Sequence, residues 1–283
     1  MEMNANVIKK VQSYEIDILQ KIDEICKKHG LEYWGIGGTA LGAVRHQGFV
    51  PWDDDIDIGM TRKDYEVFLA VAQQELPVGY HVQNFYTEHN SPFYFTKIRK
   101  DNTKFVEYYL RDYKMHHGIF VDIFPFDNIP DNPTVRKIHF KVSRFLYQLF
   151  LCKSLSTVCS SRFEQQGGYN RTYKHYVRKI VHYLLYPVPK KWLFHGLDRC
   201  VQLFNSKETK RMGHIVRRRL SVAGEVLYPI RMLKFGEIHM PVPNDYDTYL
   251  KRQFGDYMAM PPKDSRHGHL PYLVEFEDGG DKE

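Results

Sequence analysis

One segment constrains this chain more than any other: GGTALGAVRHQGFVPWDDDIDIG, which runs from Gly37 to Gly59. Its glycine pair follows the strand-like stretch LEYWGI and precedes a short helix, predicted to begin near Thr39. Glycine lets the backbone approach a ligand closely, and the unpaired N–H groups at a helix start favour phosphate. We therefore predict that Gly37, Gly38 and Thr39 bind an anionic substrate.

Two basic residues follow in the same predicted helix. Arg45 and His46 lie just before Gly48, where we expect the helix to stop. The planar guanidinium of arginine matches the geometry of phosphate oxygens. We add both residues to the predicted substrate-binding set.

The segment ends in an alternation of acids and isoleucines. A strand period of two places Asp55 and Asp57 on one face, with their side-chain roots about 6.5–7 Å apart, and turns Ile56 and Ile58 toward the core. Two carboxylates this close repel each other unless a cation lies between them. Mg²⁺ is commonly held by one or two carboxylates together with substrate phosphate. The pattern predicts a divalent-metal site for phosphoryl transfer.

A third acid and two cations are expected on neighbouring strands. Asp122 lies inside the apolar strand GIFVDIFPF, where an unpaired charge would be costly. We predict that Asp122 completes the site with Asp55 and Asp57. Lys97 and Arg99 alternate on the strand FYFTKIR and are predicted to face an anionic substrate.

Two simpler interpretations of the acidic run fit less well. A calcium loop would place Ile58 where glycine is required and Asp64 where a bidentate glutamate belongs. A solvated acidic turn does not explain the isoleucine alternation. Asp53 and Asp54 remain open between a supporting role at the metal site and simple exposure.

Composition and charge set the broad class. At 283 residues, 43% hydrophobic and 26% charged, the chain is in the globular range. Four widely spaced cysteines without a CxxC argue against a disulfide scaffold. There is no apolar stretch of signal-peptide or membrane-spanning character. We therefore expect a cytoplasmic protein, with the inner face of the membrane as a candidate peripheral location.

The distribution of apolar, basic and proline residues along the chain predicts four parts. Residues 1–130 read as mixed helix and strand, with an apolar helical stripe from Val7 to Ile25. Residues 131–222 read as basic helices, and between Val135 and Arg219 the chain carries 19 Lys/Arg against three acids. This block is open between a solvated face and a subdomain that binds an anionic membrane surface or polyanion. Residues 223–276 read as a Pro-rich segment packing back on the core, and 277–283 as a frayed tail.

Taken together, the motifs resemble the LicD family of nucleotidyltransferase-fold proteins, of which fukutin and the fukutin-related protein are distant relatives. The resemblance runs from the Gly37–Gly59 block through TKIRKDNT and VDIFPFD to MPVPNDYDTYLKRQFGDYMAMPP. It implies an α+β fold, with a nucleotidyltransferase-like mixed sheet flanked by helices, a basic helical insertion and a C-terminal wrap. It also implies that Asp55 and Asp57 bind metal and that Asp122 is the third carboxylate.

LicD-like proteins transfer phosphocholine from CDP-choline onto cell-surface glycans. The resemblance therefore implies an enzyme using Mg²⁺ or Mn²⁺, a CDP-activated alcohol donor and a glycan or lipid-linked glycan acceptor. A nucleotidyltransferase that adds NMP to a small acceptor is the alternative enzyme, and a non-catalytic membrane- or polyanion-binding protein is the alternative class. Nucleic acid is not an expected partner, because the sequence has no RNA-binding signature.

Overall fold

The structure is a computed structural model that describes residues 3–155, 173–214, 220–262, 264, 266, 268 and 271–277. Its centre is a mixed sheet with the order β1-β2-β6-β4-β3, extended by β7 and β8 at the far end of β6. These strands are β1 (Trp34–Gly35), β2 (Ile56–Thr61), β3 (Tyr80–Gln83), β4 (Thr96–Lys100), β6 (Phe120–Ile129), β7 (Arg211–Gly213) and β8 (Val222–Ala223). The central pair, β2 and β6, is parallel, and the other pairs are antiparallel.

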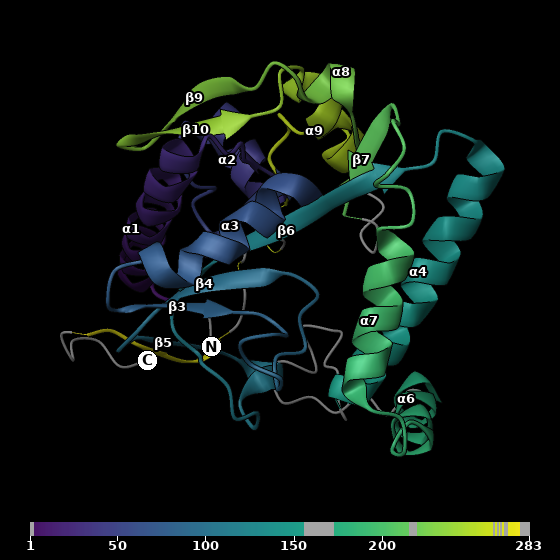
Figure 1. The fold of residues 1–283 in the computed structure, drawn as a ribbon. Helices are drawn as coiled ribbons and strands as arrows, with labels where there is room; N and C mark the ends of the chain where they lie inside the picture. The colour runs from purple at the N-terminus through teal and green to yellow at the C-terminus, as the bar shows by residue number, and fades with distance from the viewer. Residues whose placement is uncertain are drawn as a thin grey trace.

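Two helices cover one face of this sheet: α1 (Ala5–His29) and α3 (Arg62–Glu75) (Figure 1). The stripe predicted on α1 is buried against the strands, with Val11, Ile18 and Ile22 wholly enclosed. Gly30 ends α1 in the left-handed conformation, and Thr61 caps α3.

The opposite face is covered by α2 (Gly37–His46), α8 (Gly224–Leu227) and α9 (Tyr246–Phe254). Because side chains alternate along a strand, Ile123 of β6 packs toward α1 while Phe124 packs toward this second layer. The hairpin of β9 (Arg231–Phe235) and β10 (Ile238–Val242) lies beside α2 (Figure 1). The prediction of an α+β mixed sheet flanked by helices is confirmed.

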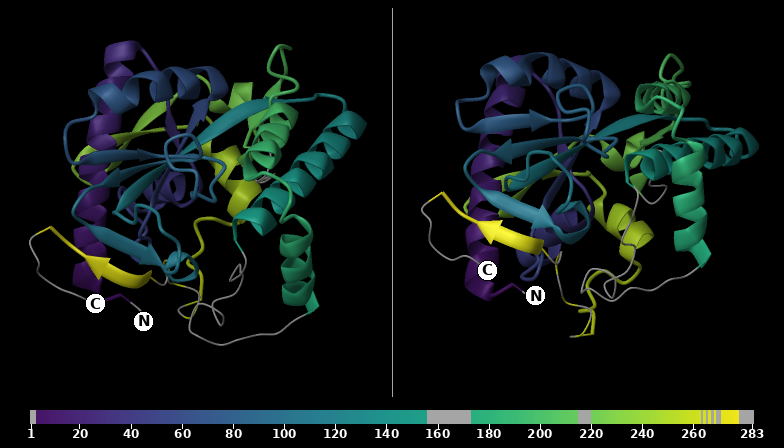
Figure 2. Two further views of the ribbon diagram at one scale, coloured as in Figure 1. Left: turned by 60° about the horizontal axis from the view of Figure 1, so that its bottom comes forward. Right: turned by 90° about the horizontal axis from the view of Figure 1, so that it is seen from below.

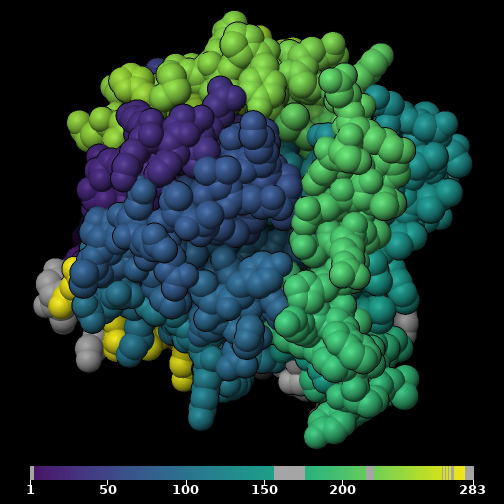
Figure 3. Space-filling view, viewed as in Figure 1, coloured from purple at the N-terminus to yellow at the C-terminus, as the bar shows by residue number. Residues whose placement is uncertain are grey.

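The basic part of the chain, residues 131–222, contains both helices and short strands. It contains α4 (Pro133–Ser154), α6 (Tyr173–Leu184) and α7 (Lys190–Val201), with α7 packed along α4 (Figures 1 and 3). It then returns to the sheet as β7, in a stretch predicted to be helical, and as β8. The loop predicted at 160–170 lies outside the described residues.

The C-terminal segment contributes a helix and a strand to the fold. The helix is α9, and β11 (Pro271–Glu275) pairs with β5 (Lys104–Glu107) at the edge of the molecule (Figure 2). β5 ends where the chain turns into the 3₁₀ helix η1 (Tyr108–Leu110). The four-part division remains a prediction, and all but the first residue of the predicted tail lies outside the described residues.

Candidate active site

The glycine turn is fixed directly against β2. Gly37 begins α2 with a φ of +54°, a conformation that favours glycine. The Ile36 N–H donates to the Asp57 carbonyl at 3.0 Å, and the Asp57 N–H donates to Thr39 Oγ1 at 2.8 Å. These two bonds hold the start of α2 beside Asp57, so the predicted phosphate turn and the predicted metal acid do meet.

Asp57, Asp122 and Lys97 form a row across three neighbouring strands. Asp57 is the register partner of Asp122, which is in turn the register partner of Lys97. The Lys97 ammonium donates to both oxygens of Asp122, at 2.8 and 3.0 Å, and lies over the Phe120 ring, 3.3 Å from its centroid. Both members of this ion pair are buried.

The pKa of the Asp122 carboxyl lies close to physiological pH. Burial and, to a smaller extent, the negative charge of Asp55 raise its pKa to about 6 against the opposing effect of Lys97. A carboxyl with a pKa in this range can exchange a proton at physiological pH.

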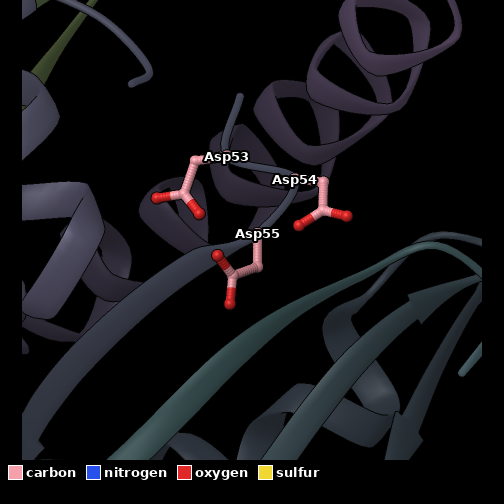
Figure 4. A group of neighbouring side chains, drawn as sticks. All are labelled: Asp53, Asp54 and Asp55. Atoms are coloured by element: carbon pink, nitrogen blue, oxygen red, sulfur yellow. The ribbon is translucent and has the colours of Figure 1, made fainter. Parts of the chain in front are cut away.

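A second group of carboxylates lies just before β2. Asp53, Asp54 and Asp55 each offer an oxygen, and these oxygens lie within 4.8 Å of one another (Figure 4). A side-chain carbon placed on Gly38 would collide with the Asp53 carboxylate, so the glycine turn also adjoins this group. Several carboxylates at such spacing suit a hard divalent cation.

This grouping shares Asp55 with the ligand set predicted from the sequence. Asp57 and Asp122 are neighbours in the sheet, but Asp122 is bound by Lys97. Asp54, left open by the sequence, is 1% exposed. The residues present therefore fit a divalent cation, and the ligand set of Asp55, Asp57 and Asp122 stays a prediction.

Arg45 and His46 lie at the other end of α2. Arg45 donates through NH1 to the backbone carbonyls of Tyr257 and Ala259, and through Nε to His46. Burial and the neighbouring guanidinium lower the pKa of His46, which keeps it neutral as an acceptor. In this structure the pair attaches the C-terminal segment to α2, and its contact with substrate stays a prediction.

Lys97 and Arg99 share a strand but have different surroundings. Lys97 points at Asp122, as described above. Arg99 is 1% exposed and donates to Gln83 and to the Gly118 carbonyl. A substrate contact for Arg99 stays a prediction, and its observed partners are all within the fold.

Sequence analysis missed Glu15. It occupies the apolar stripe of α1 four residues after Val11, is 1% exposed, and its Oε2 has no hydrogen-bond partner in the described structure. One turn earlier, Gln12 donates to the Asp53 carbonyl at 2.8 Å. An acid at a core position of the helical stripe was the available signal, because a buried charge is costly without a purpose.

Glu15 predicts a pH dependence of stability. Burial raises its pKa well above 4.5, and the charges of Asp55, Asp54, Asp53 and Asp122 raise it further. The folded state therefore keeps a proton that the unfolded chain releases, so this residue's contribution to stability declines as the pH rises above about 4.5. Glu15→Gln lacks this titration, and we expect its unfolding free energy to gain on wild type between pH 5 and pH 8.

Urea unfolding in EDTA measures this difference. Glu24→Gln, on the exposed side of the same helix, is the matched control and should follow wild type at every pH. A constant offset between Glu15→Gln and wild type across the range would contradict the interpretation.

A nucleotidyltransferase-like sheet with a glycine turn facing strand-borne acids defines a class of group-transferring enzymes. Residues 30–160 match the family model described as LicD/FKTN/FKRP, nucleotidyltransferase domain. This part of the chain belongs to that family, which confirms the resemblance, and the match supports a transferase enzyme.

Individual relatives agree with the family match. The chain is 26% identical to "Lipopolysaccharide cholinephosphotransferase LicD" of Haemophilus influenzae over 276 residues, covering 94% of this chain and 97% of the relative. A shorter stretch is 49% identical to human "Ribitol 5-phosphate transferase FKRP" over 35 residues, covering 12% of this chain and 7% of the relative. Mouse "Ribitol-5-phosphate transferase FKTN" is 34% identical over 59 residues, covering 21% and 13%.

Among the described residues, every helix is too short or too polar to cross a bilayer.

Proposed function

We propose that the enzyme transfers a phospho-alcohol group, with phosphocholine as the first candidate, from a CDP-activated donor to a sugar hydroxyl. The acceptor would be a cell-surface glycan or its lipid-linked precursor. The observation that carries the proposal is the fixing of the Gly37 turn beside Asp57 and its sheet neighbour Asp122. The names of the LicD and FKRP relatives, one a cholinephosphotransferase and the other a ribitol 5-phosphate transferase, support transfer of this chemical group.

The donor would bind where the turn and the acids meet. Asp55 and Asp57 would hold Mg²⁺ or Mn²⁺, with the adjoining carboxylates of Asp53 and Asp54 adding negative charge. Such a cation, when bound, neutralises charge on the donor diphosphate. The N–H groups of the Gly37–Thr39 turn, together with Arg45, would bind the phosphate oxygens.

In the proposed transfer, the sugar hydroxyl displaces CMP at the phosphorus that carries the alcohol. The acceptor sugar oxygen forms a bond to the phosphorus that carries the alcohol, and the bond from that phosphorus to the bridging oxygen breaks. CMP leaves with the electron pair of the broken bond. The proton of the sugar hydroxyl passes to the Asp122 carboxylate, whose pKa of about 6 suits it as a base near neutral pH.

Product analysis tests the proposal. Purified enzyme with Mg²⁺, CDP-choline and a lipooligosaccharide acceptor should release CMP and label the acceptor with phosphocholine. Release of pyrophosphate from a nucleoside triphosphate would instead favour the alternative nucleotidyltransferase. No turnover with either donor class, in the presence of acceptor and metal, would favour the non-catalytic alternative.

We also propose that the basic helices contact an anionic membrane surface. Of the 20 exposed large apolar side chains among the described residues, 12 lie between Val135 and Leu203, which places the apolar surface on this part. On α6 they share one face of the helix, and on α4 they form a second stripe. The α6 residues are Tyr176, Val177, Ile180, Tyr183 and Leu184, and the α4 residues are Val135, Ile138, Val142 and Phe145.

Charge favours a membrane over an uncharged partner. Lys137, Lys141 and Arg144 of α4 are exposed beside the apolar stripe, as is Lys179 of α6. Basic amphipathic helices with exposed aromatic and aliphatic residues suit anionic lipid headgroups. Phe150 of α4 is not part of this surface, because it is fully buried against Phe194 of α7.

Vesicle flotation measures this contact. Ile180→Glu places a charge in the α6 stripe, and we expect its binding to phosphatidylglycerol vesicles to fall by about tenfold or more, because an apolar side chain can no longer insert. Val78→Glu is the control, since Val78 is even more exposed than Ile180 but lies in the turn between α3 and β3. Equal binding of both variants and wild type would leave the stripe as a solvated face.

A further inference from the structure

A cavity of about 430 Å³ lies at the far end of the sheet from the acidic site. Six elements wall it: the end of β6, the first turns of α4, β7, β8, α8 and α9. Its lining includes Ile129, Phe140, Val222, Ala223, Val226 and Thr248. A space of this size admits a sugar-sized ligand.

The polar lining of this cavity is strongly cationic. Arg136, Arg211 and Arg252 contribute three guanidinium groups, against a single carboxylate from Glu225. These arginines come from α4, β7 and α9, so residues far apart in the sequence converge here. The buried hydroxyl of Ser221 also lines the wall and accepts from Arg252 at 2.5 Å.

The Arg211 side chain makes no polar contact with the described part of the protein. Among the described residues its guanidinium has no ion pair and no hydrogen bond, although Glu225 lines the same cavity. Arg136, by contrast, donates to the carbonyls of Pro130 and Asp131. A guanidinium left without a protein partner in a cavity retains its donors for a ligand, and phosphate matches them well.

The cavity connects to the acidic site through Tyr249. This residue lines the cavity and is 2% exposed. Burial raises the pKa of its hydroxyl, and both Gly37 and Asp57 lie close enough to influence that pKa as well. The two ends are still distinct, because Ile129 follows Asp122 by seven residues along β6, about 23 Å of extended strand. A ligand in the cavity therefore lies beyond the reacting phosphorus of the donor.

We propose that the cavity binds an organic phosphate, and that this phosphate belongs to the acceptor: a phosphorylated glycan whose phosphorylated sugar is held by Arg136, Arg211 and Arg252, while its reacting hydroxyl belongs to another sugar that lies nearer the acids. The assignment to the acceptor rests on the proposed function, whereas the phosphate site rests on the cavity itself. Three guanidinium groups against one carboxylate leave an excess of two positive charges, which matches the charge of a phosphomonoester. The cavity volume leaves room for the attached sugar.

Binding without turnover tests the site. Calorimetric titration of the full chain in EDTA, with glucose 6-phosphate as the probe, removes any metal-dependent donor binding from the measurement. We expect Arg211→Gln to weaken glucose 6-phosphate by about tenfold or more, the usual effect of losing a charge-assisted hydrogen bond. Arg231→Gln is the matched control, because Arg231 is an exposed arginine on β9 outside the cavity. Glucose itself should give no heat.

Three results would overturn the proposal in separate ways. Equal affinity of Arg211→Gln, Arg231→Gln and wild type would remove the phosphate site. Weak binding of inorganic phosphate alone, indifferent to Arg211, would mark an adventitious ion only. Tighter binding of CMP than of glucose 6-phosphate, lost in Arg211→Gln, would overturn the assignment to the acceptor and give the site to the donor. Arg211-dependent binding of glucose 6-phosphate by a protein that never turns over CDP-choline would keep the cavity while the proposed function fell.

Discussion

Replacing Asp57 with Asn is expected to lower CMP release from CDP-choline by about 10³-fold, with the fold intact. The carboxylate lies at the centre of the site, between the Gly37 turn and Asp122. Removing its charge weakens the proposed cation site, and the loss of one electrostatic contact to a transition state typically costs 10²- to 10³-fold in rate. The reaction is followed as CMP released in the presence of Mg²⁺ and acceptor.

The fold should survive this substitution for a specific reason. The two hydrogen bonds that fix Asp57 to the start of α2 use its backbone N–H and carbonyl, which asparagine also has. We therefore expect the unfolding free energy to change by no more than about 1 kcal/mol. Asp112→Asn, at an acid with 81% of its side chain exposed, is the control and should keep wild-type rates. Wild-type CMP release from Asp57→Asn would refute the assignment of the active site.

Local patterns were sufficient to predict the elements that present the site. The alternation of Asp57 with Ile56 and Ile58 gave the strand and its buried face, because strand periodicity is a property of adjacent residues. The glycine pair gave the turn at the start of α2. Each of these signals is contained within about five residues.

Contacts between distant segments could not be predicted in the same way. Lys97 meets Asp122 only because β4 and β6 pair in one particular register, which no local pattern specifies. Glu15 approaches the acids from a helix some 40 residues earlier, and the arginine cavity gathers side chains at positions 136, 211 and 252. β7 is three residues long in a basic stretch, so its composition gave no strand signal. Tertiary packing decides all four features.

The buried pair of Lys97 and Asp122 is expected to dominate the stability of the site. In Lys97→Met the Asp122 carboxylate would lie buried without its cation, because Lys97 supplies both of the hydrogen bonds described for it. Breaking a buried ion pair by removing one partner costs about 3–5 kcal/mol. We expect a loss of this size in unfolding free energy, measured by urea denaturation at pH 8, where Asp122 is ionised in wild type.

The matched control is an exposed pair of the same chemistry. Lys104 lies 2.7 Å from Glu275 with half of its side chain exposed, and exposed pairs contribute about 0–1 kcal/mol, so Lys104→Met should have little effect. Adding Asp122→Leu to Lys97→Met should restore part of the lost stability, since the uncompensated charge is then gone. That recovery distinguishes an electrostatic cost from the loss of Lys97 packing against the Phe120 ring, which the second substitution would not repair. If Lys97→Met costs no more than Lys104→Met, the carboxyl of Asp122 is neutral in the folded protein, and its role as the base that accepts the acceptor's proton must be abandoned.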